Sequence, residues 1–122
     1  MKITALILLG IVVAAYTALY FIQEKLLFFP TPLPKQHDYE FPQSFKEINI
    51  SAKDGTQLNC LHFNSLQAKG IVIYFHGNAG NLASWVFEAS LYTQLNYDVF
   101  FVDYRSYGKS EGKIKSEEQL FF

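Results

Sequence analysis

The chain has 122 residues, of which 50% are hydrophobic and 17% aromatic, and its formal net charge is -1. This length allows at most one small domain, and the apolar content predicts a packed core in place of disorder. The near-zero charge excludes the basic surface that nucleic-acid binding requires. A single cysteine, Cys60, excludes an intramolecular disulfide and a cysteine-rich metal site, and it is expected to be a small core residue. No metal or other cofactor is expected.

The N-terminal stretch, residues 3–22, contains no charged side chain and is mostly aliphatic. As a helix it would rise about 30 Å, the thickness of the hydrocarbon core of a bilayer. Aromatic side chains near its far end suit the membrane interface, namely Tyr16, Tyr20 and Phe21. We therefore predict a transmembrane anchor over residues 1–25, which makes the membrane a partner of the chain.

The few charges around this stretch favour one orientation. Lys2 precedes it, whereas Glu24 and Lys25 behind it cancel, so the N-terminus is expected to be cytoplasmic and the domain on the opposite side. A cleaved signal peptide is the alternative, with residues 13–15 as the cleavage site, although the apolar run continues through Ile22. A buried helix of a soluble protein is a third interpretation. It is disfavoured because no polar residue interrupts the run.

The next segment, residues 26–44, is expected to be a proline-rich linker or strap. Pro30, Pro32 and Pro34 exclude a helix there and favour an extended chain. The apolar residues before Pro30 leave two placements open, packed on the domain or lying at the membrane interface. His37 in this segment has no visible partner.

An antiparallel hairpin at a sheet edge is predicted next, at the start of the domain expected over residues 45–122. Its strands are residues 45–50 and 56–63, and Asp54-Gly55 between them is a tight-turn signal. His62 on the second strand is expected to be solvent-facing or satisfied by a neighbour, and not a ligand.

A parallel strand–helix–strand unit follows the hairpin. The apolar run at residues 71–75 predicts a strand buried on both faces. Apolar residues at helical spacing predict a helix over residues 82–95, capped by Asn81 or Ser84 and stopped by a left-handed Asn96. Residues 97–103 predict a second buried strand.

Two loops stand at the carboxyl ends of these strands. The glycine-rich segment at residues 76–81 can leave backbone N–H groups uncovered for an anion or a developing negative charge. The second loop, residues 103–112, lies where open α/β sheets bind ligands. A capping box at residues 116–119 predicts a further helix.

The two loops, read as YFHGNAGN at residues 74–81 and DYRSYGKSEG at residues 103–112, resemble the α/β-hydrolase superfamily. The pattern is closest to membrane-anchored serine hydrolases that carry HGNAGN and DYRGYGxSxG. Ser106 and Asn96 stand where that family commonly has glycine. The resemblance implies the N-terminal part of an α/β-hydrolase sheet after a transmembrane helix, since four strands are expected here and the fold it resembles has eight.

The resemblance also implies a role for each residue of the loops. The backbone N–H of Asn78 would be one oxyanion-hole donor, and Gly77 would let the backbone approach closely. His76 would be structural and not the catalytic histidine. Three residues of the second loop would brace the first, namely Asp103, Arg105 and Tyr107. The family's nucleophile, acid and histidine would all come later in the chain, so none is expected within residues 1–122.

Two motif matches are expected to be coincidental. Residues 108–112 match G-x-S-x-G, but Ser110 does not directly follow a strand or directly precede a helix, as a nucleophile elbow requires. The same stretch resembles the end of a phosphate-binding P-loop, but Asp103 stands where that motif needs its first glycine.

Two functions remain open from the sequence. The first is a serine hydrolase acting on a small acyl substrate (an ester, thioester or amide), with this chain as its N-terminal piece. The second is a non-catalytic membrane-anchored fragment or half-domain, which could pair with a complementing C-terminal chain.

Overall fold

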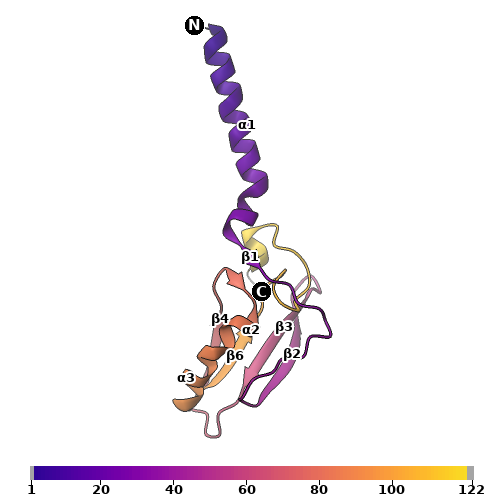
Figure 1. Cartoon of the computed structure of the whole chain (residues 1–122), viewed down its shortest axis with the longest axis vertical. Helices are drawn as coiled ribbons and strands as arrows, with labels where there is room; N and C mark the ends of the chain where they lie inside the picture. The colour runs from indigo at the N-terminus through magenta and orange to yellow at the C-terminus, as the bar shows by residue number, and fades with distance from the viewer. Residues whose placement is uncertain (1, 121–122) are drawn as a thin grey trace.

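The computed structural model describes the backbone of residues 2–120 and the side chains of residues 3–120. Helix α1 (Lys2–Leu27) rises alone from one end of a small α/β domain, as Figure 1 shows. Its apolar stretch has a mean hydropathy of 2.4 and none of it is buried, so this helix is long and apolar enough to cross a membrane. The interpretation as a buried core helix is therefore wrong.

A four-stranded mixed sheet forms the centre of the domain, in the order β2-β3-β6-β4. Strands β2 and β3 make the predicted antiparallel hairpin at one edge, β3 pairs antiparallel with β6, and β4 pairs parallel with β6. The bounds of the strands are Phe45–Ser51 (β2), Gln57–Phe63 (β3), Ile71–Phe75 (β4) and Asp98–Val102 (β6). The turn between β2 and β3 contains Gly55 at a φ of 84°.

The helix predicted over residues 82–95 is broken into three pieces. These are α2 (Leu82–Trp85), the 3₁₀ turn η1 (Val86–Glu88) and α3 (Ala89–Gln94). Of the two candidate caps, Asn81 is used, because its side-chain oxygen accepts the Ala83 N–H at 3.0 Å. Asn96 has the predicted left-handed backbone, with a φ of 64°. Ser106 is also left-handed at a φ of 71°, which explains why glycine suits this position in the family it resembles.

The core lies between the helical pieces and one face of the sheet. Phe63 and Phe101 from the strands meet Leu82, Val86 and Ala89 from the helical side. Tyr39 from the proline-rich segment also belongs to this core, so that segment is more than a linker. Cys60 is fully buried, as predicted for a core residue. The division of the chain at residues 25 and 44 remains a prediction.

Strand β4 is not buried on both faces, which corrects the prediction for residues 71–75. Ile71, Ile73 and Phe75 are 55%, 57% and 51% exposed, whereas Val72 and Tyr74 between them pack against the core. The physical reason is that the helical pieces cover one face only, and β4 is one of the two edge strands of the sheet among the described residues.

The backbone of the proline-rich strap pairs with the domain, whereas Leu26, Leu27 and Phe29 before Pro30 are more than half exposed, so both placements of these apolar side chains stay open. Strand β1 (Phe29–Pro30) pairs parallel with β5 (Ala79–Gly80), a short strand within the glycine-rich loop. The strap continues past the second loop, where Leu33 N–H donates to the Gly108 carbonyl at 2.8 Å. One connected backbone therefore joins the end of α1 to both loops.

The residues of the predicted capping box overlap one 3₁₀ turn, η2 (Glu117–Leu120). The Gln119 side chain accepts the Lys115 N–H at 2.9 Å, whereas a capping box would use the Ser116 N–H, so the predicted reciprocal contact is not formed among the described residues. Any continuation of the predicted helix through residues 121–122 lies outside the described residues.

Candidate functional site

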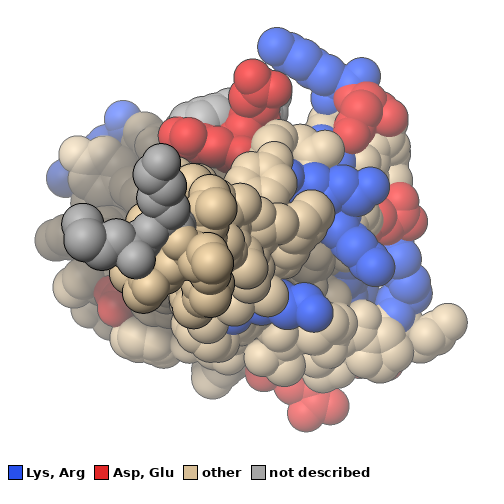
Figure 2. Space-filling model, turned by 90° about the horizontal axis from the view of Figure 1, so that it is seen from above, with Lys and Arg blue, Asp and Glu red and all other residues tan. Residues whose placement is uncertain are grey.

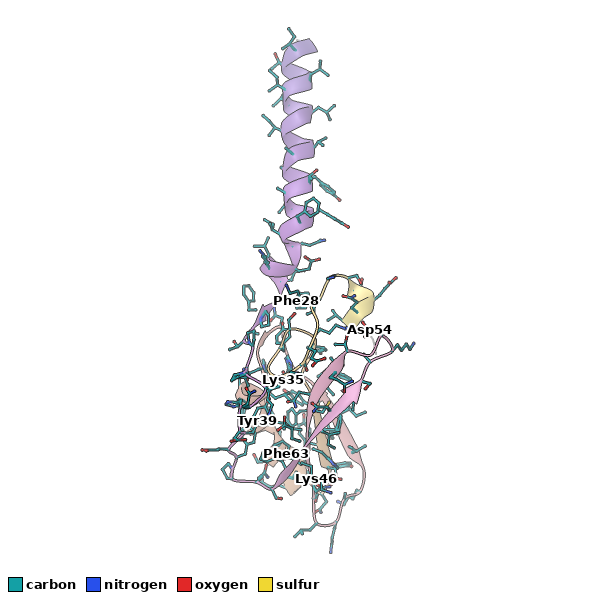
Figure 3. The ribbon with its side chains drawn as sticks, turned by 90° about the vertical axis from the view of Figure 1, so that its right-hand side faces the viewer. Phe28, Lys35, Tyr39, Lys46, Asp54 and Phe63 are labelled. Atoms are coloured by element: carbon teal, nitrogen blue, oxygen red, sulfur yellow. The ribbon has the colours of Figure 1, made fainter. Side chains whose placement is uncertain are left out.

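A cavity of about 680 Å³ lies at the foot of α1, beside the glycine-rich loop. Four segments far apart in the sequence meet there: the end of α1, the end of β4 with its loop, the loop after β6, and η2. The lining residues are Phe28, Phe75, His76, Gly77, Asn78, Tyr104, Tyr107 and Leu120. Figure 3 shows Phe28 at the junction between the helix and the domain. The walls are mainly aromatic, and the loop with Asn78 forms the polar side.

Asn78 is held on its carbonyl and its side chain but not on its N–H. Its carbonyl accepts the Phe29 N–H at 2.8 Å and the Tyr107 hydroxyl at 2.7 Å. Its side-chain amide donates to the Leu27 carbonyl, at the end of α1, at 2.7 Å. The backbone N–H makes no hydrogen bond within the part of the chain that the structure describes. A fixed peptide with a free donor is what an oxyanion hole requires.

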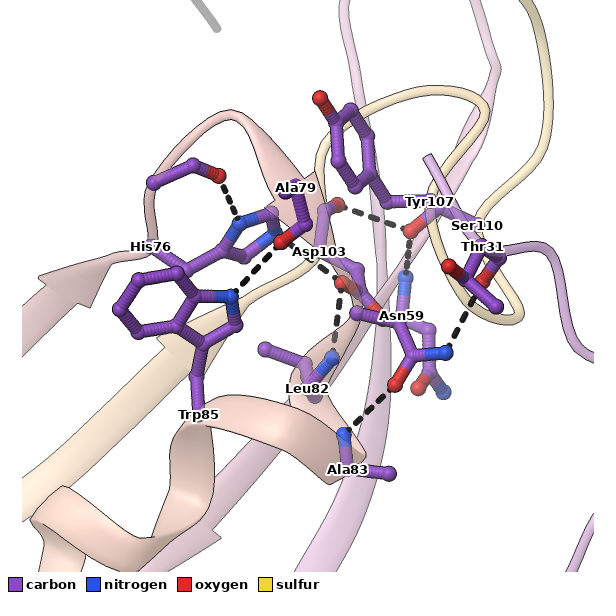
Figure 4. Close-up of polar contacts among 12 residues, drawn as sticks. Thr31, Asn59, His76, Ala79, Leu82, Ala83, Trp85, Asp103, Tyr107 and Ser110 are labelled. Carbon is purple, nitrogen blue, oxygen red and sulfur yellow. Dashed lines mark hydrogen bonds and ion pairs between the residues drawn. The ribbon is translucent and has the colours of Figure 1, made fainter. Parts of the chain in front are cut away.

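Gly77 lies against the Trp85 ring, which explains why the loop uses glycine there. A Cβ at this position would come within 3.1 Å of the indole carbons. The Trp85 indole N–H donates to the Ala79 carbonyl at 2.9 Å, as the dashed line in Figure 4 marks. The sequence does not predict this contact between Trp85 and the loop.

His76 is enclosed beneath the loop. Its Nδ1 lies 2.6 Å from the Gly77 carbonyl oxygen, and its Nε2 lies 3.1 Å from Asp103 Oδ1. Both side chains of this pair are fully buried. The ring also packs edge-on against Tyr104, with centroids 4.8 Å apart. The side chain of His76 is thus held by buried contacts, and its structural role remains a prediction.

Asp103 joins the second loop to the start of the helical segment. Its Oδ1 accepts the Leu82 N–H at 3.1 Å, and its Oδ2 is buried with no hydrogen bond among the described residues. Burial raises the pKa of Asp103, and the contacts with His76 and Leu82 partly offset this effect. Gly108 makes room for the carboxylate, because a Cβ there would overlap Oδ2.

Arg105 and Tyr107 hold the second loop to its neighbours, as braces would. The Arg105 guanidinium binds both carboxylate oxygens of Asp54 at 2.9 and 3.0 Å, and its Nε–H donates to the Gln119 carbonyl at 3.1 Å. The hydrogen bonds from Arg105 hold the pKa of Asp54 well below its usual range. The hairpin turn, the second loop and η2 are thereby joined, while Tyr107 ties the same loop to Asn78.

The hydroxyl of Ser110 is hydrogen-bonded to backbone groups. It donates to the Asp103 carbonyl at 2.8 Å and accepts the Asn59 N–H, also at 2.8 Å (Figure 4). Neither partner is a base that could activate a nucleophile. This geometry agrees with the prediction that the G-x-S-x-G match is coincidental.

Thr31 contributes to the site in a way that the sequence does not indicate. Its carbonyl accepts the Asn81 side-chain amide at 2.9 Å and the Gly108 N–H at 3.2 Å. A backbone contact about 50 residues away in the chain leaves no local pattern to find. His62, expected to be satisfied or solvent-facing, has its Nε2 at 3.1 Å from Asp98 Oδ2 and is therefore satisfied by a neighbour. Within residues 2–120, no group of His, Cys, Asp and Glu side chains is arranged to hold a metal.

Comparison with known proteins gives relatives by sequence and by fold. The chain is 31% identical to the protein Bem46 of Schizosaccharomyces pombe over 92% of its own length. It is also 31% identical to the α/β-hydrolase domain-containing protein WAV2 of Arabidopsis thaliana over 84% of its length. A solved esterase of Pyrococcus furiosus matches 74% of the chain with a TM-score of 0.53 and 17% identity. No protein-family profile matches.

The chain thus shares sequence and fold with the α/β-hydrolase superfamily, which confirms the predicted fold class. It spans 40% of the length of Bem46, 36% of WAV2 and 35% of the esterase chain. The match to the esterase, at this identity, concerns the fold alone.

Proposed function

We propose that this chain supplies half of the oxyanion hole of a serine hydrolase that cleaves an ester, thioester or amide. The observation that carries the proposal is the free Asn78 N–H on a loop fixed from three directions beside an apolar cavity. A donor aimed at a developing oxyanion contributes most when it is held in place and shielded from water. The nucleophile, acid and catalytic histidine would lie outside residues 1–122.

Labelling with a serine-reactive fluorophosphonate tests this assignment. Residues 1–122 alone are expected to take up no label. They should also leave the hydrolysis of p-nitrophenyl acetate at its background rate. A chimera in which these residues replace the aligned region of the α/β-hydrolase domain-containing protein WAV2 is expected to be labelled. Stable labelling of the isolated chain at Ser110 would contradict the assignment of the nucleophile to another part of the protein.

A matched pair of substitutions in the chimera tests the oxyanion donor. Asn78→Pro removes the backbone N–H, and labelling is expected to fall by about 100-fold, the usual cost of one such donor. Asn78→Ala keeps the N–H and removes only the side chain, so its loss should be much smaller. Equal losses in the two variants would indicate that the side chain, and not the N–H, matters.

A non-catalytic half-domain is the second candidate, because the apolar row on β4 is more than half exposed. Such a half-domain would pair with a complementing C-terminal chain that covers Ile71 and Ile73. This candidate predicts that the chimera folds but is never labelled, whereas the hydrolase proposal predicts labelling.

We further propose that α1 spans the membrane with its N-terminus in the cytoplasm and the domain on the opposite side. The surface seen along α1 carries Lys and Arg mainly on one side, with acidic residues among them (Figure 2), so it gives no strong charge signal of its own. The variant Lys53→Cys tests the orientation, because Cys60 is buried and should stay silent. A membrane-impermeant maleimide is expected to label this variant from outside intact cells, and labelling only after lysis would reverse the orientation.

A further inference from the structure

The cavity beside Asn78 is suited to an apolar ligand. Its volume of about 680 Å³ lies within the usual range of small-molecule pockets, roughly 300 to 1,000 Å³. Phe28, Phe75, Tyr104 and Leu120 form most of the wall, and none of the lining residues is Asp, Glu, Lys or Arg. His76 is already enclosed by its contacts with Gly77 and Asp103. The polar groups offered to a ligand are therefore few, and they include the free N–H of Asn78 and the Tyr104 hydroxyl.

The position of the cavity relative to α1 narrows the class of ligand. Phe28 N–H still donates to the Glu24 carbonyl at 2.8 Å, so the helical hydrogen bonding reaches the cavity wall. The Leu27 carbonyl is bonded to the Asn78 side chain, so the helix ends against the loop that lines the cavity. A helix of membrane-spanning length and hydropathy thus ends at the cavity, with Glu24 and Lys25 marking its interfacial end.

We propose that this cavity binds one unbranched acyl chain that enters from the plane of the membrane, with its carbonyl oxygen at the Asn78 N–H. A water-soluble polar substrate would find few hydrogen-bonding partners on these walls, whereas an acyl chain needs none along its length. Its carbonyl is the one group that requires a donor. The placement of that carbonyl rests on the proposed oxyanion role of Asn78, and the binding of the chain does not.

Photocrosslinking of the whole chain in phosphatidylcholine vesicles tests the proposal. Two probes carry a diazirine in the middle of a 16-carbon chain, one a free fatty acid and the other a phosphatidylcholine. Adducts are expected on Phe28, Tyr104 and Leu120, and unlabelled hexadecanoate but not butyrate should compete for them. The probe that labels these residues identifies the source of the chain. Adducts confined to residues 3–27 would overturn the proposal, because they would report lipid contact of α1 alone.

A matched pair of substitutions separates the cavity from its surroundings. Phe28→Asp places a charge in the apolar wall and is expected to lower the adducts on Tyr104 and Leu120 about tenfold. Leu26→Asp places the same charge at a residue that is 57% exposed and does not line the cavity, and should leave these adducts unchanged. Equal losses in both variants would overturn the assignment.

Two further readings keep the outcome decisive. Adducts on α1 serve as an internal standard for membrane insertion, and if Phe28→Asp fails to insert, competition by chain length in the unsubstituted protein decides. Binding requires no nucleophile, so a chimera that takes up no fluorophosphonate would reject the hydrolase and leave the crosslinking result standing. A hydrolytically active chimera with no adducts on the cavity residues would support the hydrolase and reject the binding of an acyl chain in the cavity.

Discussion

At the scale of single residues, the second loop is organised around one buried carboxylate. Asp103 is the first residue of the second loop, and its side chain contacts His76 and the Leu82 N–H. Its second oxygen is accommodated by the missing side chain of Gly108, whose φ is 49°. Shape and backbone conformation therefore both require glycine at this position.

Gly108→Ala is expected to destabilise the domain by about 3 kcal/mol or more, because left-handed strain adds to a steric overlap with Asp103. Gly55→Ala is the matched control, since Gly55 has a φ of 84° but open space around its Cβ position. It should cost only about 1 kcal/mol. Thermal unfolding of both variants in detergent micelles measures the difference, and equal costs would show that backbone strain alone accounts for the effect.

The Arg105–Asp54 pair predicts a pH dependence. The folded pKa of Asp54 is lowered by its hydrogen bonds with Arg105, so the unfolded chain takes up a proton first as the pH falls. The contribution is fully present above the usual Asp pKa of about 4 and is lost as the pH falls through the folded pKa. Asp103 acts in the opposite direction, because burial raises its pKa.

Comparison with Asp54→Asn isolates this effect, since the contribution of Asp103 is present in both proteins. The unsubstituted chain should be more stable than the variant at neutral pH, and the difference should shrink below about pH 4. Unfolding measured across pH 2 to 7 tests this expectation. A constant difference over that range would mean that the charge of Asp54 contributes nothing.

At the scale of elements, the end of α1 and the strap act as a support for the glycine-rich loop. The Leu27 carbonyl binds the Asn78 side chain, and the strap pairs with the loop through Phe29 and Thr31. The end of α1 is thus joined to the site by hydrogen bonds.

Asn78→Ala is expected to loosen this support, because a single hydrogen bond contributes about 1 kcal/mol. Amide hydrogen exchange at Phe29 and Thr31, which donate to the loop, should accelerate about fivefold. Asn64→Ala is the control, because Asn64 also makes one side-chain hydrogen bond, to Asp98 at 3.3 Å in a different loop. Unchanged exchange in Asn78→Ala would show that the hydrogen bond to the end of α1 does not stabilise the loop.

At the scale of the whole molecule, the sheet is covered on one face and open on part of the other. Ile71 and Ile73 lie more than half exposed on the edge strand β4. An apolar strand at a sheet edge is a surface for association with another chain.

The isolated chain is therefore expected to self-associate in detergent. The extent of this association should exceed what helix α1 alone would cause. Ile73→Lys should reduce this association by placing a charge on the exposed face of β4. Leu66→Lys is the control, because Leu66 is fully exposed in a loop away from the strand. Light scattering after size exclusion compares the three proteins, and an equal reduction in both variants would assign the effect to net charge.

The sequence by itself determined the features that depend on local pattern. The apolar run predicts α1, alternation with Asp54-Gly55 predicts the hairpin, and the left-handed Asn96 was predicted from its place after the helical stripe. The loop motifs led to the superfamily and to Asn78 as the candidate donor. Each of these is a property of neighbouring residues, and so a single sequence can show it.

Only the tertiary structure decided the features that depend on distant partners. The exposed face of β4 follows from which strands lie at the edges, whereas a run of apolar residues looks the same in a central strand. The bond between Leu27 and Asn78, and the room that Gly108 leaves for Asp103, join segments separated in the chain. Such contacts depend on how the elements pack, and local composition does not predict them.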